Sequence, residues 1–315
     1  MIRELAARSA TFGAVKELRG DSYSYIEAFD ALGGSVVGLC DAHRDSGADL
    51  APPYKRGSLA WLDRTRERRY VNDVWTSPVR NLHSQAIGYF ARAEDHLRGA
   101  GILIAAPRIF SSPATLARTV LVAVSAGAWL LDFEVETIER VRRHLTVEMR
   151  VRAERVLLAE KAGESDPSAA QELEALKQIA LQSGLEPKTS KKGWPYVGEP
   201  YPSDTELMRQ FDRRTGAVVD PELLQTLLSW SVHANPNSMA LANLTPTSSG
   251  RHHDGVRSTM ISLSLGQAAA LVLPAAHTFY RGTIEMYRYF GLSTESFEQD
   301  ALPHLQAIGS AAAQR

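Results

Sequence analysis

Cysteine is almost absent from this sequence, since Cys40 is the only one in 315 residues. A single cysteine excludes an internal disulfide and any cysteine-rich zinc or iron–sulfur site. A basic excess is also lacking, because 35 Lys and Arg residues face 36 Asp and Glu residues. Proteins that bind duplex DNA usually carry such an excess. We therefore expect a reduced thiol and no nucleic-acid partner.

Long hydrophobic runs are missing as well. The longest apolar stretches are residues 119–131, too short for a helix that must span a bilayer with about 20 residues, and residues 259–276. The second stretch is interrupted by Ser262, Ser264 and Gln267. The charged N-terminus has no apolar core of the signal-peptide type. We expect both stretches to be buried helices of a cytoplasmic protein without a membrane partner.

Three motifs of common enzyme classes are not found: GxxxxGK[ST], GxGxxG after a strand, and GxSxG. Their absence disfavours nucleotide hydrolysis, Rossmann redox chemistry and α/β-hydrolase chemistry. Strand signals are scarce too, because alternating β-branched runs are absent and Ala and Leu dominate.

Apolar residues spaced three and four apart predict helices along almost the whole chain. We expect one all-α domain over residues 1–315, with loop insertions near 185–202 and 234–255 that can cover a site. The helices are expected at residues 2–18, 22–44, 73–105, 113–132, 133–162, 167–184, 203–214, 220–233, 256–291 and 294–309.

Asp132 ends the most apolar of these helices and follows Trp129, Leu130 and Leu131. An ionised carboxylate with few waters around it is a good proton acceptor from an amine or a hydroxyl. We therefore take Asp132 as a candidate catalytic base and Trp129 as part of the substrate site. The alternative is that Asp132 is the N-cap of the helix that starts near Phe133.

His233 lies in the last turn of a predicted helix, within LLSWSVHANPN at residues 227–237. The helix dipole favours the protonated imidazole there, which suits a general acid or base or an anion contact. Ser229 lies four residues earlier on the same face, and Asn235 follows the helix, so both are candidate substrate contacts. The alternative for His233 is a capping role on a main-chain carbonyl.

Arg118 is the only charged residue between Leu116 and Leu131. An arginine on a buried helix needs a carboxylate or a ligand anion, and Asp132 is four helical turns away. Two interpretations stay open. Arg118 binds a substrate carboxylate, phosphate or sulfate, or it pairs with a structural Glu.

Further along the chain, Arg281 and Glu285 have the spacing of an ion pair on one helix.

The loop at residues 185–202 carries Lys188, Lys191 and Lys192 among aromatic residues. Such a loop can contact an acidic protein, a nucleic acid or a polar ligand, or it can be an exposed loop anchored by its aromatic rings. A polar cluster at residues 251–254 contains two adjacent His residues, which rarely converge on zinc without further ligands. No HExxH motif is present. We expect neither a metal nor a cofactor.

The segment ARTVLVAVSAGAWLLD, the Arg- and Glu-rich helix after it and the later LLSWSVHANP resemble a group of actinobacterial helical proteins, some of which have been compared with the HEPN fold. This resemblance implies a non-catalytic ligand-binding or toxin–antitoxin-type module. HEPN ribonucleases place an Arg a few residues before a His on one helix. No Arg precedes His233 at that spacing, so the resemblance does not extend to ribonuclease residues.

The size, helical character and Ala- and Arg-rich composition of the chain are similar to those of the larger subunit of the aziridine-forming enzyme of azinomycin-type biosynthesis. This resemblance implies that an amine on a carrier-protein-bound amino-acid derivative attacks the neighbouring carbon and expels sulfate, without a cofactor. It also implies two partners, a small second subunit and an acidic amino-group carrier protein.

The candidate residues suit that reaction. A base must take the proton of the amine, cationic donors must stabilise the leaving anion, and both reacting groups must be held in line. Complementary charge would bring the acidic carrier to the lysines. We expect Asp132 as the base, His233 and Arg118 as anion contacts, Ser229, Asn235 and Trp129 as further substrate contacts, and Lys188, Lys191 and Lys192 as carrier contacts.

Overall fold

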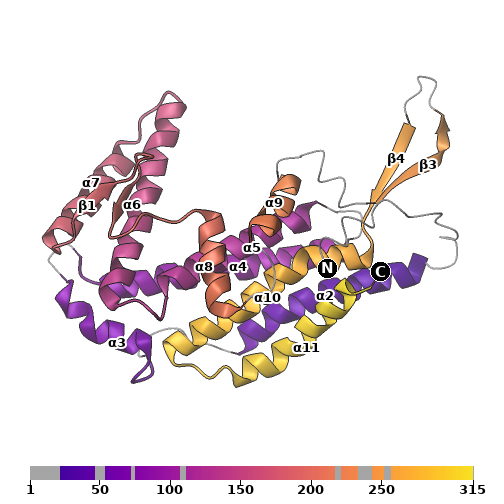
Figure 1. Cartoon of the computed structure of the whole chain (residues 1–315), viewed down its shortest axis with the longest axis horizontal. Coiled ribbons are helices and arrows are strands. Elements are labelled where there is room, and N and C mark those ends of the chain that lie inside the picture. The colour runs from indigo at the N-terminus through magenta and orange to yellow at the C-terminus, as the bar shows by residue number, and fades with distance from the viewer. Residues whose placement is uncertain are drawn as a thin grey trace.

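The computed structural model describes residues 22–46, 54–71, 75–106, 111–216, 221–232, 243–251 and 257–314. Within these ranges the chain forms ten α-helices (Figure 1), which confirms the all-α prediction. They are α2 (Ser22–Asp45), α3 (Leu59–Arg66), α4 (Pro78–Ala105), α5 (Ser112–Leu130), α6 (Thr137–Lys161), α7 (Pro167–Gln182), α8 (Asp204–Thr215), α9 (Pro221–Val232), α10 (Leu265–Phe290) and α11 (Glu295–Ala312). A short 3-10 helix, η1 (Glu67–Arg69), follows α3.

Two antiparallel hairpins accompany the helices. Strand β1 (Pro187–Thr189) pairs with β2 (Pro195–Val197), and β3 (Asn243–Arg251) pairs with β4 (Arg257–Ser262). The β1–β2 hairpin lies within the loop predicted at 185–202, and the β3–β4 hairpin overlaps the loop predicted at 234–255. The β3–β4 hairpin extends away from the helices, at the opposite end of the molecule from β1 (Figure 1).

Short polar side chains fix where several helices begin. The Ser203 hydroxyl accepts a hydrogen bond from the Glu206 main-chain N–H at 3.3 Å, as their spacing predicts. Ser264 and Gln267 form a complete capping box at the start of α10. At the other end of that helix Gly291 has a φ of 76°, which ends the helix in the left-handed conformation that glycine adopts without strain.

The main core lies between α2, α4, α5, α10 and α11. Helix α5 is its central element, because it is apolar nearly all round. It is the one helix in the described ranges that is long and apolar enough to cross a membrane, but 72% of that window is buried inside the protein, as in the core helix of a soluble protein. Gly282 lets α10 approach closely, since an added Cβ would lie 2.3 Å from Val124 Cγ1.

A smaller hydrophobic cluster lies between α6, α7 and β2 and includes Trp75, Val141 and Ile179. Together with the β1–β2 hairpin, α6 and α7 form an arm at one end of the molecule (Figure 1). Helix α4 joins the two clusters, because its Val79 packs in the smaller one and its Leu82 in the main core.

Four helix predictions need correction or lie outside the described ranges. The helix predicted from residue 73 begins at Pro78. The helix predicted from residue 256 begins at Leu265, because Thr259 and Ile261 belong to strand β4 and the capping box holds the helix start. The helix predicted from residue 133 begins at Thr137. Helix α3 was not predicted at all, and the helix predicted at 2–18 lies outside the described residues.

Candidate functional site

Asp132 lies in the turn between α5 and α6. Its carboxylate accepts a hydrogen bond from the Glu134 main-chain N–H at 3.1 Å, which closes a local turn. Helix α6 starts five residues later, and its N-cap is Glu136. The capping alternative for Asp132 is therefore wrong, because its carboxylate stabilises the connecting turn and not the first turn of the helix.

Two arginines from different helices form ion pairs with this carboxylate. The guanidinium of Arg143 on α6 lies 3.1 Å from Asp132 Oδ2, and that of Arg214 at the end of α8 lies 3.3 Å from Oδ1. Each carboxylate oxygen thus faces a separate cation, which satisfies the need of a mostly buried charge for partners.

Arg214 also binds a second carboxylate, that of Glu285 on α10. Its Nη2 lies 2.9 Å from Glu285 Oε2. The predicted pair of Arg281 with Glu285 is not formed as such, since Arg281 donates to the Thr215 carbonyl at 2.8 Å. We call Asp132, Arg143, Arg214 and Glu285 the Asp132 cluster. Their side chains are between 8% and 19% exposed, so the cluster is largely desolvated and still reached by solvent.

Trp129 borders the Asp132 cluster, as predicted from its position on α5. The Arg143 guanidinium lies 4.8 Å from the centre of the indole ring, a cation–π contact. The same arginine donates to the Trp129 carbonyl and to Glu199 Oε1, both at 2.7 Å. The edge of the Tyr201 ring packs against the indole, with 5.5 Å between ring centroids.

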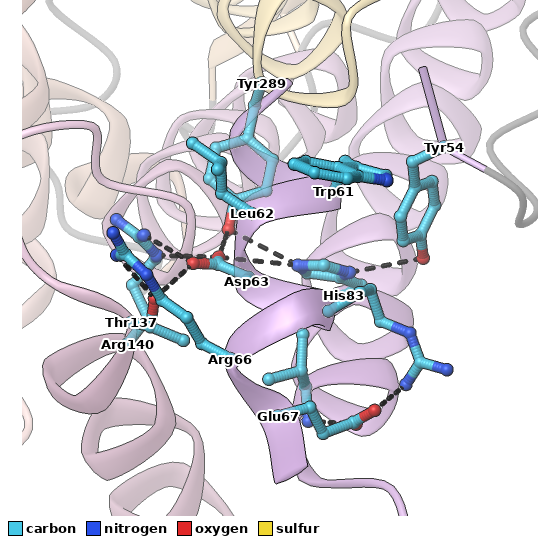
Figure 2. A network of polar contacts seen from close by, with 12 residues as sticks. Tyr54, Trp61, Leu62, Asp63, Arg66, Glu67, His83, Thr137, Arg140 and Tyr289 are labelled. Carbon is cyan, nitrogen blue, oxygen red and sulfur yellow. Dashed lines mark hydrogen bonds and ion pairs between the residues drawn. The ribbon is translucent and has the colours of Figure 1, made fainter. Parts of the chain in front are cut away.

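A second polar network lies deeper, around the carboxylate of Asp63 on α3 (Figure 2). Thr137 donates to Asp63 Oδ1 at 2.6 Å, and Arg140 donates to both carboxylate oxygens at 2.8 and 3.0 Å. The Tyr289 hydroxyl donates to Oδ2 as well. Burial raises the pKa of Asp63. The contact with His83, whose Nε2 lies 3.7 Å from Oδ2, and the hydrogen bonds from Arg140 and Thr137 outweigh burial and hold that pKa well below its usual range.

His83 extends this network toward the surface. In Figure 2 its ring lies on the opposite side of Asp63 from Arg140, and Tyr54 lies beyond it. One ring nitrogen lies 3.3 Å from the Tyr289 hydroxyl and the other 3.2 Å from the Tyr54 hydroxyl. Burial lowers the pKa of His83, so the ring is neutral in the fold.

Arg140 connects the two sites. Its Nη1 donates to the main-chain carbonyl of Asp132 at 2.6 Å and to that of Val135. The buried Asp63 network therefore holds the turn that carries Asp132, while its own polar groups are used in contacts within the protein. We take the Asp132 cluster as the candidate functional site and the Asp63 network as its support.

The other predicted site residues do not all gather at Asp132. Arg118 pairs with Asp204 on α8 at 3.4 Å, and not with a Glu. It lies about 20 Å from Asp132 along α5, from the rise of 1.5 Å per residue. Ser229 is half-buried on α9, which packs against α5. His233 and Asn235 lie outside the described residues.

Lys188, Lys191 and Lys192 are exposed on the β1–β2 hairpin and the turn that joins its strands. Aromatic rings anchor both the turn of this hairpin and its connection to α8. The Arg150 guanidinium lies 5.3 Å from the Trp194 ring centre and 4.9 Å from that of Tyr201. The lysines are thus presented to solvent on a fixed support.

Sequence reasoning missed Arg214 and Glu285 as members of the site. Glu285 had a signal, because it lies between the apolar residues Ile284 and Met286 in the sequence. Asp63 and Arg140 had none that distinguishes them from the many charged residues around them.

Among the residues that the structure describes, no group of three or more His, Cys, Asp or Glu side chains is arranged to hold a metal ion. Comparison of the chain with protein-family models, with curated proteins and with solved structures found no match.

Proposed function

We propose that the chain is a cofactor-independent enzyme of secondary metabolism that closes an aziridine ring. An amine on a carrier-protein-bound amino-acid derivative attacks the neighbouring carbon, and sulfate leaves. The observation that carries the proposal is the position of Arg214, which bridges the carboxylates of Asp132 and Glu285 at 3.3 and 2.9 Å. A base and an anion-stabilising cation thereby lie side by side in a largely desolvated place.

The charges of the site favour an amine as the group that faces it. Three carboxylates, those of Asp132, Glu285 and Glu199, converge with the two guanidinium groups of Arg143 and Arg214. The excess of one negative charge attracts a basic nitrogen. A site that only binds a free anion would need an excess of positive charge.

In the proposed step the amine nitrogen forms a bond to the neighbouring carbon as the bond from that carbon to the sulfate oxygen breaks. The proton of the nitrogen goes to the Asp132 carboxylate. Asp132 then loses its negative charge, so Arg143 and Arg214 are free to face the sulfate dianion. This exchange stabilises the transition state more than the ground state, which is the requirement for catalysis.

The proposal includes two protein partners. The exposed Lys188, Lys191 and Lys192 would meet an acidic carrier protein through complementary charge, mainly by speeding encounter. The second partner is a small subunit. His233 and Asn235 would complete the substrate contacts from the segment that follows α9.

Intact mass spectrometry tests the proposed reaction. A sulfated amino-acid derivative on its carrier protein is incubated with the chain, with and without co-expressed small partners. We expect the substrate to lose the mass of sulfuric acid only when the active chain is present, and NMR to identify an aziridine and not the isomeric alkene. No mass change under any pairing would contradict the proposal and favour the non-catalytic HEPN-like module.

A further inference from the structure

Three hydrogen-bond donors on α5 have no acceptor among the described residues. They are Arg118 Nε, Ser125 Oγ and Trp129 Nε1, and they make up three of the five buried side-chain polar atoms without a partner in the described ranges. Folded proteins leave few buried polar groups unpaired, because each costs about 1–3 kcal/mol. Three on one helix indicate that their acceptors come from elsewhere.

The three donors lie on one line along α5. At 100° per residue, the direction of Ser125 differs from that of Arg118 by about 20°, and Trp129 differs by about 20° in the other sense. The rise of the helix puts about 16 Å between Arg118 and Trp129. Trp129 is the end of the line that borders the Asp132 cluster. We call Arg118, Ser125 and Trp129 the donor row.

Residues 199–204, which lead from β2 into α8, run beside the donor row in the opposite direction. From Tyr201, which contacts Trp129, to Asp204, which pairs with Arg118, three extended residue steps cover about 10 Å of the length of the row. Two of these residues are prolines, which lack an N–H and favour an extended chain. The contacts that fix this segment are Glu199 with Arg143 at 2.7 Å, Tyr201 with Trp129 at 5.5 Å between ring centroids, and Asp204 with Arg118 at 3.4 Å.

We propose that the donor row binds the non-reacting arm of the substrate, an extended chain that carries amide and carboxylate oxygens. This inference rests on the proposed function, because it places the reacting amine at Asp132. The Ser125 hydroxyl and the Trp129 indole N–H donate to carbonyl oxygens of the arm. Arg118, whose side chain is 24% exposed and pairs with Asp204 alone among the described residues, donates to the carboxylate of the arm.

The chain contains a matched control for the row. Thr283 on α10 is fully buried, and its hydroxyl also lacks a partner in the described ranges, but it lies on a different helix from the row. Thr283→Val removes a buried hydroxyl and keeps the volume, as Ser125→Ala nearly does. Trp129→Phe removes the indole N–H and keeps an aromatic ring.

The test measures binding by calorimetry, with a probe that cannot react. The probe is the carrier-free, N-acetylated amino-acid derivative with a hydroxyl in place of the sulfate ester. We expect Ser125→Ala and Trp129→Phe each to raise the dissociation constant about threefold to tenfold, the value of one hydrogen bond. Thr283→Val should leave it unchanged. The melting temperature of Ser125→Ala should stay level or rise, since this variant loses an unpaired donor. That of Trp129→Phe should fall, because the smaller ring leaves a cavity in the core.

Absence of probe binding, or equal dissociation constants for all variants, would overturn the inference. A lower melting temperature of Ser125→Ala with unchanged binding would overturn it too, because the hydroxyl would then have an acceptor within the chain. The proposed function fails separately. If the row variants weaken probe binding but the sulfated substrate releases no sulfate, the donor row stands and the reaction is rejected. If sulfate is released but the row variants bind the probe as the wild type does, the reaction stands and the donor row is rejected.

Discussion

The guanidinium group of Arg140 joins the carboxylate of Asp63 to the main-chain carbonyl of Asp132. It lies 2.8 Å from Asp63 Oδ1 and 2.6 Å from the Asp132 carbonyl oxygen. One buried side chain therefore fixes both a fully buried anion and the turn that presents the candidate base. The geometry of the Asp132 cluster depends on a network that has no contact with solvent at its centre.

Replacing Arg140 by Met should lower the free energy of unfolding by about 3–5 kcal/mol. The substitution leaves the Asp63 carboxylate buried without its cation, and such a charge is expensive. Urea unfolding measures the effect. The control is Arg142→Met, two residues further along α6 and 37% exposed, which should change stability by about 0.5 kcal/mol or less. A loss below about 1 kcal/mol for Arg140→Met would contradict the structural role of the network.

Gly282→Ala should destabilise the protein by about 1–3 kcal/mol, because the new Cβ would lie 2.3 Å from Val124 Cγ1 and push α10 from α5. Gly88→Ala on α4 makes a matched comparison. No heavy atom would lie within 4 Å of its Cβ, so the better helix propensity of Ala should stabilise by up to about 1 kcal/mol. Thermal unfolding of both variants checks the opposite signs. A neutral Gly282→Ala would mean that the two helices pack less closely than described.

The free energy of unfolding should decrease as the pH drops below about 6.5, because of His144. Burial, together with the positive charge of Arg152, lowers the pKa of His144 to about 3. Between pH 6.5 and 3 the unfolded chain takes up a proton that the folded chain does not, so the free energy of unfolding falls by at most about 1.4 kcal/mol per pH unit from this group. At higher pH both states hold a neutral ring, and this contribution is constant.

The variant His144→Gln should remove that part of the pH dependence, measured by urea unfolding at several pH values. The same measurement on His96→Gln, half-exposed on α4, is the control and should keep the slope of the wild type. An unchanged slope for His144→Gln would show that the ring is protonated inside the fold.

Reversing the charge of Lys188, Lys191 and Lys192 to Glu should slow association with the acidic carrier protein at least tenfold at low salt. The effect should shrink as ionic strength rises, because salt screens exposed charges. Stopped-flow association at two salt concentrations measures both. Equal rates for the wild type and the triple variant would place the carrier elsewhere on the surface.

The helices were predictable from sequence because their apolar spacing and their caps are local signals. Ser203 and Glu206 are three residues apart, so the start of α8 could be read directly. Ser264 and Gln267 have the same spacing at the start of α10, but the prediction passed over it and began that helix at residue 256. Helix α3 was missed because it has only eight residues with charges among them. Periodicity needs a longer window to stand out.

The candidate site was only partly predictable. Trp129 and Asp132 are close in sequence, and their proximity follows from the helix end. Arg214 lies 71 residues from Glu285, and only the packing of α8 and α10 on α5 brings both to Asp132. Arg118 shows the converse, since it lies on α5, the helix that leads to the Asp132 turn, and is still about 20 Å from Asp132 along the helix axis.

The most direct test of the account is the rate of sulfate release by Asp132→Asn, compared with Asp166→Asn. Asparagine keeps the shape of the side chain and the acceptor for the Glu134 N–H but cannot take the proton. Asp166 is a carboxylate at a helix start remote from the cluster. We predict that Asp132→Asn lowers kcat at least about 100-fold, the usual contribution of a general base, with its fold intact by circular dichroism, and that Asp166→Asn keeps the wild-type rate. Wild-type turnover by a folded Asp132→Asn would contradict the assignment of the site.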